Sequence, residues 1–132
     1  MVFLGTCPVI YLIEQPAILG PVAKGRVAGL LGRGEVLAVS DLVRMECLVG
    51  PLKRDDAVLL AGYRLFFESP DVRVLPISPA VCDRAAEIRA RHGIRPLDSL
   101  HLAAAVEHGC SLFLSNDAQL KRFPDVVVEI LA

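Results

Sequence analysis

The chain has no long hydrophobic run, although its overall composition is apolar. Of its 132 residues, 54% are hydrophobic, and the mean hydropathy of +0.52 is high for a soluble protein. A membrane-spanning helix needs roughly 20 consecutive apolar residues, and no run approaches that length. The N-terminus also lacks a basic segment before its apolar run, so we expect no signal peptide. These absences favour one cytoplasmic domain over residues 1–132, with no membrane contact and with an apolar surface patch for a partner.

The cysteines lack the spacing of a zinc site or of a disulfide framework. Cys7, Cys47, Cys82 and Cys110 are scattered, with no CxxC pair and no cysteine–histidine cluster. Each lies among apolar residues. Buried free thiols in a reducing compartment are therefore expected.

The chain also lacks an excess of charge of either sign. Its 14 Lys and Arg residues stand against 15 Asp and Glu residues, which gives a net charge of −1 at pH 7. A protein with a broad nucleic-acid contact surface would carry a basic excess. Any contact with nucleic acid is therefore expected to be local, around acids that a metal ion neutralises.

Short apolar runs alternate with helical patterns along the chain. The runs are continuous and rich in Val, Ile and Leu, which is typical of strands buried on both faces of a sheet. The predicted strands are 2–4, 35–40, 72–77, 110–115 and 126–131. The predicted helices are 7–14, 22–31, 42–49, 55–67, 79–91 and 97–108, with a short one at 117–123. Gly50 and Pro51 are expected to close the third helix. This alternation predicts an α/β fold with a parallel sheet between two layers of helices.

The carboxyl ends of three predicted strands mark the expected place of a ligand site. In a parallel sheet the ligand site lies outside the carboxyl ends of the strands. Gly5, Ser40–Asp41 and 115–117 occupy that edge. Such residues also cap helices, which is the expected role of Ser40–Asp41 and of one residue of the pair Asn116 and Asp117.

Glu46 is the most informative acid, because helical periodicity places it among apolar residues. It shares a stripe, expected to face the core, with Leu42, Met45 and Val49. A buried glutamate is rare unless it is paired or bound to a metal. Pairing with an arginine such as Arg44 or Arg95 and a role in a functional site are equally good interpretations of this residue alone.

The acids near the other strand ends are weaker indicators one by one. Asp98 lies in the first turn of the helix at 97–108, where capping and the helix dipole ordinarily explain an acid. His101, one turn later, is more typically a packed residue than a ligand. Together, however, Glu46, Asp98 and Asp117 form an oxygen-only set, which selects Mg²⁺ or Mn²⁺ over zinc. Such a set suits metal-assisted phosphodiester hydrolysis.

Four segments carry a recognisable pattern: FLGTCPVIYLIE, SDLVRMECL, RPLDSLHLAAAVEHG and SLFLSNDAQL. Together they resemble the PIN-domain family, and within it the VapC-type toxins of bacterial and archaeal toxin–antitoxin pairs. The resemblance extends over the whole chain. It aligns the inward glutamate of the family with Glu46, the acid of its signature helix with Asp98, and its closing acid with Asp117 beside Asn116.

The resemblance implies a PIN-like three-layer α/β/α sandwich and a metal-dependent endoribonuclease. The metal ligands that it implies, for Mg²⁺ or Mn²⁺, are Glu46, Asp98 and Asp117. Thr6 and Asn116 would be polar neighbours of the site, and Ser40 a possible one. The resemblance also implies an RNA substrate, an antitoxin protein that covers the groove, and usually a homodimer. An apolar groove for a partner is expected around Tyr11, Leu12, Leu30, Leu31, Leu60 and Phe66.

The chain departs from the family pattern at Gly5. The family places an aspartate at the tip of its first strand, and glycine stands there in this sequence. Glycine could simply ease a tight turn after the strand. We favour the loss of a metal ligand, because the flanking residues match the family closely.

The expected function is therefore a ribonuclease toxin that is disarmed at Gly5. The alternative is a PIN scaffold without catalysis that binds protein or RNA. A receiver-like phospho-acceptor domain also has acids at strand tips, but it needs a lysine after a late strand. None of Lys24, Lys53 and Lys121 is so placed, which disfavours that fold.

Overall fold

A parallel sheet with β1 at its centre organises the fold. The computed structural model describes residues 1–131, which form a sheet of five strands in the order β3-β2-β1-β4-β5. The strands are β1 (Val2–Leu4), β2 (Leu37–Ser40), β3 (Val72–Leu75), β4 (Leu112–Ser115) and β5 (Val127–Ile130). β1 pairs in parallel with β2 on one side and with β4 on the other. The strand order therefore reverses between β1 and β4, and this is where open α/β sheets bind ligands.

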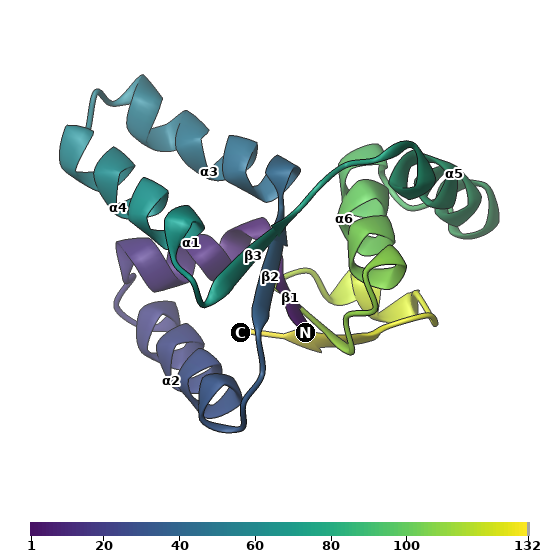
Figure 1. The fold of residues 1–132 in the computed structure, drawn as a ribbon, viewed down its shortest axis with the longest axis horizontal. Coiled ribbons are helices and arrows are strands. Elements are labelled where there is room, and N and C mark those ends of the chain that lie inside the picture. Colours follow the sequence, from purple (N-terminus) through teal and green to yellow (C-terminus); the bar gives the residue numbers. More distant parts are fainter. Residues whose placement is uncertain (132) are drawn as a thin grey trace.

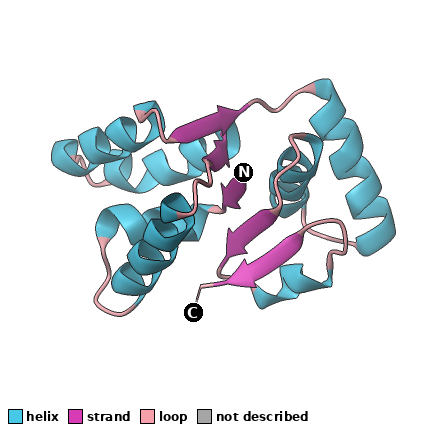
Figure 2. Cartoon of the chain, turned by 60° about the horizontal axis from the view of Figure 1, so that its bottom comes forward, coloured by secondary structure: helices cyan, strands magenta, loops and turns pink. Residues whose placement is uncertain are grey.

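Helices cover both faces of the sheet. The helices are α1 (Thr6–Glu14), α2 (Leu19–Gly32), α3 (Asp41–Lys53), α4 (Ala57–Glu68), α5 (Pro79–His92) and α6 (Pro96–Glu107), and the 3₁₀ helix is η1 (Ala118–Arg122). α1 to α4 lie on one side of the sheet and α5 and α6 on the other (Figure 1). Seen from a second direction, the strands run between these two groups of helices (Figure 2). The predicted three-layer α/β/α sandwich is confirmed.

Every predicted strand and helix is present, and most boundaries differ by one to three residues. The clearest error concerns α3, which was expected to close at Gly50–Pro51 but continues to Lys53. Pro51 cannot donate a hydrogen bond to the carbonyl one turn earlier. It is nevertheless buried, and the chain remains helical beyond it, with the Arg54 amide 3.1 Å from the Gly50 carbonyl. Tertiary packing here overrides the local signal for a helix end.

The predicted buried face of α3 is also wrong by about one residue. Met45 and Val49 are 48% and 42% exposed, whereas Val43 and Cys47 belong to the core. Both sets of residues recur at helical spacing, so periodicity alone could not choose between them. Glu46 consequently lies at the border of the core, half-buried, rather than at its centre.

The cysteines are all free thiols, but they are not all buried. Cys47 and Cys110 are buried, Cys7 is half-buried and Cys82 is exposed. α5 buries Val81, Ala85 and Ile88, so position 82 faces away from the core. The expectation of a buried thiol is wrong for Cys82.

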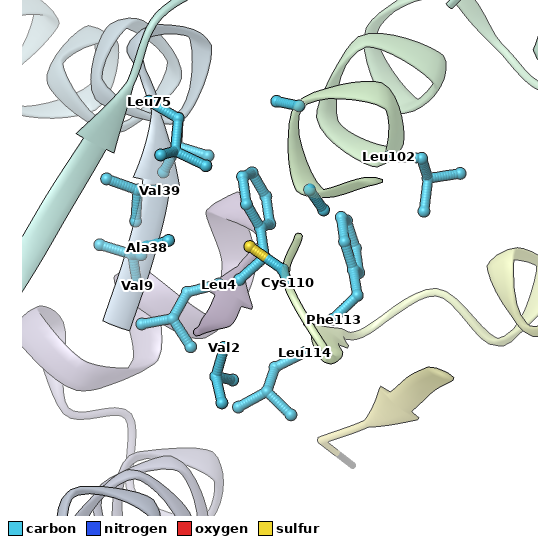
Figure 3. Packing of buried hydrophobic residues seen from close by; sticks show 14 of the residues in the cluster. Val2, Leu4, Val9, Ala38, Val39, Leu75, Leu102, Cys110, Phe113 and Leu114 are labelled. Atoms are coloured by element: carbon cyan, nitrogen blue, oxygen red, sulfur yellow. The ribbon is translucent and has the colours of Figure 1, made fainter. Parts of the chain in front are cut away.

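The two faces of the central strands are packed by alternate side chains. Phe3 is opposite Phe113 in the parallel register, and their rings stack with centroids 4.9 Å apart. Phe113 points to the side of the sheet that α6 covers, whereas Leu114 points to the opposite side (Figure 3). Phe3 and Leu114 are both fully buried. The core therefore extends through both layers around β1 and β4.

An apolar groove lies among α1, α2, α4 and the start of β3. It has a volume of about 450 Å³, and Leu12, Leu31 and Phe66 are among the residues that line it. These three were predicted for a partner groove. Leu30 was predicted with them, but it is only 2% exposed and belongs to the core, since it lies on the inner side of α2. Tyr11 and Leu60 are half-buried outside this groove.

The structure also bears on membrane insertion. Among the helices of residues 1–131, none combines the length and the apolar character that crossing a bilayer requires.

Truncating Leu114 should test the role of the central strands in stability. We expect Leu114→Ala to lower the free energy of unfolding by about 2–5 kcal/mol, because the cavity that it leaves between β4 and the helices cannot collapse fully. The matched control is Leu65→Ala on α4, where the side chain is 70% exposed, and it should change stability by less than about 0.5 kcal/mol. Urea unfolding measures both, and equal losses would contradict the assignment of the core.

Candidate active site

A cleft opens at the carboxyl ends of β1 and β4, at the reversal of strand order. Its volume is about 390 Å³. Most of the predicted site residues line it: Gly5, Thr6, Glu46, Asp98, Asn116 and Asp117, whereas Ser40 does not. They come from the start of α1, from α3 and α6, and from the turn after β4. The structure thus brings together residues that are far apart in the sequence.

Gly5 links β1 to α1 without using the conformational freedom of glycine. Its φ of −67° and ψ of 173° are extended backbone angles that any residue adopts. A Cβ built at Gly5 would lie 3.1 Å from the Leu114 carbonyl oxygen, with its other neighbours, Pro8 Cδ and Phe113 Cε1, at ordinary contact distances of 3.8 and 3.9 Å. A side chain would therefore require a small shift of that carbonyl. The turn itself does not require glycine.

Two donors hold one oxygen of the Glu46 carboxylate. Thr6 Oγ1 donates to Glu46 Oε1 over 2.7 Å, and His101 Nε2 lies 2.7 Å from the same oxygen. The arginine partners considered from the sequence are wrong. The guanidinium carbon of Arg44 lies 5.6 Å from the centroid of the Phe67 ring, and Arg95 pairs with other acids. Oε1 is therefore fixed by both neighbours, while neither of these contacts engages Oε2.

His101 connects this carboxylate to the end of β2. Its ring is buried, and Nδ1 lies 3.4 Å from Ser40 Oγ. Ser40 Oγ accepts the Val43 amide over 3.3 Å as the N-cap of α3, which confirms its predicted capping role. A neutral His101 with its proton on Nε2 can accept from Ser40 and donate to Glu46, so one network joins β2, α3, α6 and α1.

The Glu46 carboxyl is held in its ionised form. The hydrogen bond from His101 lowers the pKa of Glu46 below its ordinary value, and the hydrogen bond from Thr6 acts in the same direction. Partial burial opposes this shift, because it disfavours the charged form. The net effect keeps a negative charge in the cleft.

Arg95 joins the other two acids. Its Nε donates to Asp98 Oδ2 and its Nη2 to Asp117 Oδ2, each over 2.8 Å. The second oxygen of Asp117 accepts the Gln119 amide over 2.9 Å, so Asp117 is the residue that caps η1. Asp98 lies in the first turn of α6, as predicted.

The carboxylates of the cleft do not fit a divalent metal ion as they are arranged. Within residues 1–131, no group of three or more His, Cys, Asp or Glu side chains is placed to hold one. Glu46 is turned to Thr6 and His101, and both aspartates are turned to Arg95. Gly5 contributes no side chain. The oxygen set expected for Mg²⁺ or Mn²⁺ is therefore not assembled.

Three residues that line the cleft, Cys7, Arg95 and His101, were not predicted as site residues from the sequence. The sequence alone indicates a packed residue for His101, a possible partner of Glu46 for Arg95 and a buried thiol for Cys7. Partial burial raises the pKa of Cys7, with the nearby charge of Glu46 acting in the same direction and a hydrogen bond to Asn116 opposing it. The spacing of Arg95 three residues before Asp98 was the available signal, since such residues are neighbours around a helix start.

Removing the Thr6 hydroxyl should raise the pKa of Glu46. Thr6→Val preserves shape but deletes one hydrogen bond to the ionised carboxyl, so the pKa of Glu46 should move up toward its ordinary value. A depressed carboxyl pKa contributes stability above the unfolded-state pKa, and this contribution is lost as pH falls through the folded-state pKa. The variant should therefore unfold more easily than the parent at pH 7, and the difference should vanish in stronger acid.

Carbon-13 NMR titration measures the pKa of the Glu46 carboxyl. Urea unfolding at pH 7 and in stronger acid measures the difference in stability. Thr6→Ser is the matched control, because it retains the hydroxyl and should leave the pKa of Glu46 near that of the parent. An unchanged pKa in Thr6→Val would show that this hydrogen bond does not hold the carboxylate.

The chain is similar to known proteins in sequence and in fold. The sequence model of the PIN domain family matches residues 2–126 of the chain. No curated protein sequence is similar enough to match.

Several solved structures share the fold over essentially their whole length. The VapBC2 structure from Rickettsia felis, bound to a DNA fragment from its promoter, has 19% identity and a TM-score of 0.82, with 100% of both chains covered. A toxin–antitoxin complex from Klebsiella pneumoniae has 20% identity and a TM-score of 0.76, with 96% of each chain covered. VapC20 from Mycobacterium tuberculosis, a Sarcin-Ricin loop cleaving toxin, has 19% identity and a TM-score of 0.73, with 96% of this chain and 99% of that chain covered. Since the family match spans nearly all of the sequence and the fold agrees with it, the chain belongs to the PIN domain family.

Proposed function

We propose that this chain is the toxin of a VapC-type toxin–antitoxin pair, an endoribonuclease scaffold whose cleavage activity is impaired by Gly5. The observation that carries the proposal is the convergence of Glu46, Asp98 and Asp117 on one cleft at the reversal of strand order, with Gly5 at the tip of β1. Carboxylates are the ligands that Mg²⁺ or Mn²⁺ takes in phosphodiester hydrolysis, and in this chain those of the cleft are paired with protein donors instead.

The RNA substrate and the antitoxin partner are supported by the structural relatives. VapC20 from Mycobacterium tuberculosis is a toxin that cleaves the Sarcin-Ricin loop, and the structure from Klebsiella pneumoniae is a toxin–antitoxin complex. We assign RNA cleavage and an antitoxin to this chain on that basis. The groove lined by Leu12, Leu31 and Phe66 is the surface that we assign to the antitoxin. A homodimer and a cytoplasmic location complete the proposal.

The polar residues of the cleft would position the acids. Thr6 and His101 hold Glu46 Oε1, so the carboxylate cannot rotate freely. Asn116 lies beside Asp117 and lines the same cleft. Since Gly5 supplies no carboxylate and the remaining acids are paired with protein donors, we infer that the chain as it stands cleaves RNA slowly or not at all.

A second candidate function is a PIN scaffold that has given up catalysis and binds protein or RNA. The pairing of Arg95 with both Asp98 and Asp117 favours it, because the cleft is electrostatically satisfied by its own residues. Both candidates predict low activity for this chain. They differ in what an added carboxylate at Gly5 would do.

Gly5→Asp should create metal-dependent ribonuclease activity. The backbone angles at Gly5 suit any residue, and the added side chain needs only a small shift of the Leu114 carbonyl. Because small misplacements of reacting groups cost on the order of 10²-fold in rate, we expect a gain of at least that size. Cleavage of structured RNA is measured with Mg²⁺, with Mn²⁺ and with a chelator.

Gly5→Asn is the matched control, since it has the same shape without the charge, and it should remain inactive. Equal activity in the parent and in Gly5→Asp would show that Gly5 does not impair the site. An inert, folded Gly5→Asp protein would favour the binding scaffold over the disarmed ribonuclease.

The same variant should respond to metal in its stability. Without metal, the added carboxylate increases repulsion within the cleft, so Gly5→Asp should melt at a lower temperature than the parent. A metal ion that binds the folded state stabilises it by mass action, so Mn²⁺ should raise the melting temperature of Gly5→Asp more than that of the parent. Thermal melts with Mn²⁺ and with chelator measure this difference, and an identical response of the two proteins would contradict it.

A further inference from the structure

One guanidinium group bridges two acids that arrive from different parts of the chain. Asp98 belongs to α6 and Asp117 to the turn after β4, and Arg95 contacts both through separate nitrogens, each 2.8 Å from an Oδ2 oxygen. The side chain of Arg95 is 71% exposed, whereas those of Asp98 and Asp117 are 24% and 27% exposed. The cation therefore approaches two largely covered carboxylates from the solvent side.

The two contacts use two different nitrogens of the Arg95 guanidinium group, Nε and Nη2. Capping a helix would not require this pair of contacts. Asp117 already caps η1 with its other oxygen, and α6 begins at Pro96 without any side-chain cap. The Arg95 side chain therefore binds the two carboxylates and does not cap a helix. An arginine remains protonated at all accessible pH values, so this positive charge is permanent.

Few cations are placed to balance the charges of Asp98 and Asp117. Arg122 lines the adjoining cavity together with Arg95, Asp98 and Asp117, but its guanidinium donates to the backbone carbonyl of His92 and forms no ion pair with either acid in residues 1–131. Among the described residues, Arg95 is the cation that pairs with both Asp98 and Asp117, and Gly5 adds no further negative charge. A divalent ion on these two carboxylates would have to displace the guanidinium from both.

We propose that Arg95 is an internal counter-cation of the cleft, which occupies the carboxylates of Asp98 and Asp117 and competes with divalent metal ions for them. The contact is reversible, because an exposed ion pair is weak and the arginine side chain is free to swing into solvent. Metal occupancy of the cleft is then set by an exchange between one guanidinium and one ion. This inference rests on the proposed function only in taking these two aspartates as the metal-facing acids.

Neutralising Arg95 should strengthen metal binding. We compare the parent with Arg95→Gln, and both again in the Gly5→Asp background, by electron paramagnetic resonance titration of Mn²⁺. Removing a cation a few ångströms from a divalent ion in a largely hydrated site should tighten Mn²⁺ binding by about tenfold in both backgrounds. Arg89→Gln on α5 is the matched control, because it removes the same charge from an exposed position outside the cleft. It should leave Mn²⁺ affinity unchanged.

A second measurement follows the guanidinium itself. In the Gly5→Asp protein, the chemical shift of the Arg95 Nε–H should be that of a hydrogen-bonded proton without metal and should move toward the value of a free arginine when Mg²⁺ saturates the site. A signal that stays unchanged on saturation would overturn the proposal. The proposal would also be overturned if Arg95→Gln failed to tighten Mn²⁺ binding both in the parent and in the Gly5→Asp background. This includes the case in which none of the proteins binds Mn²⁺.

These outcomes are separable from those of the proposed function. Tighter Mn²⁺ binding in Arg95→Gln, with no RNA cleavage by any Gly5→Asp protein, would leave the counter-cation standing and remove the ribonuclease. If Gly5→Asp cleaves RNA and Arg95→Gln does not change the affinity for Mn²⁺, the ribonuclease would stand and the counter-cation would be removed.

Discussion

The parallel pairing of β1 with both β2 and β4 is the constraint on which the rest of the structure depends. β1 has three residues, all at most 1% exposed, and its neighbours hold it in register on both sides. Because the strand order reverses beside it, the ends of β1 and β4 form one edge of a cleft between the helix layers. α1 starts directly after Gly5, which places Thr6 within reach of Glu46.

Within that cleft, the acids are satisfied by the protein itself. Glu46 is held by Thr6 and His101, while Asp98 and Asp117 share Arg95. In the described part of the chain, every buried side-chain nitrogen and oxygen has a hydrogen-bond partner. A carboxylate that is left unpaired in a partly desolvated cleft would be costly, so these contacts stabilise the folded protein in the absence of any ion.

Local patterns predicted the elements of the fold better than their faces or their ends. Apolar runs marked all the strands because a parallel sheet buries both faces of each strand, which leaves a strong signal in composition. The end of α3 was missed because Pro51 is buried by packing that its neighbours in sequence do not reveal. Its inner face was missed because two residue sets with the same helical period competed, and only the packing of α3 against its neighbours α4, α1 and β2 selects Val43 and Cys47.

The sequence by itself determined the order and type of the elements, the acids that follow the strands and the family that they resemble, and it placed glycine where that family carries aspartate. Periodicity and residue type determine these features within a few neighbouring residues, so no tertiary contact is needed to infer them. Only the tertiary structure decided which donor meets which acid. Thr6 and His101 reach Glu46 from 40 and 55 residues away, and Arg95 reaches Asp117 across 22. Such pairs form where packed helices bring side chains within about 3 Å, and no local pattern encodes that distance.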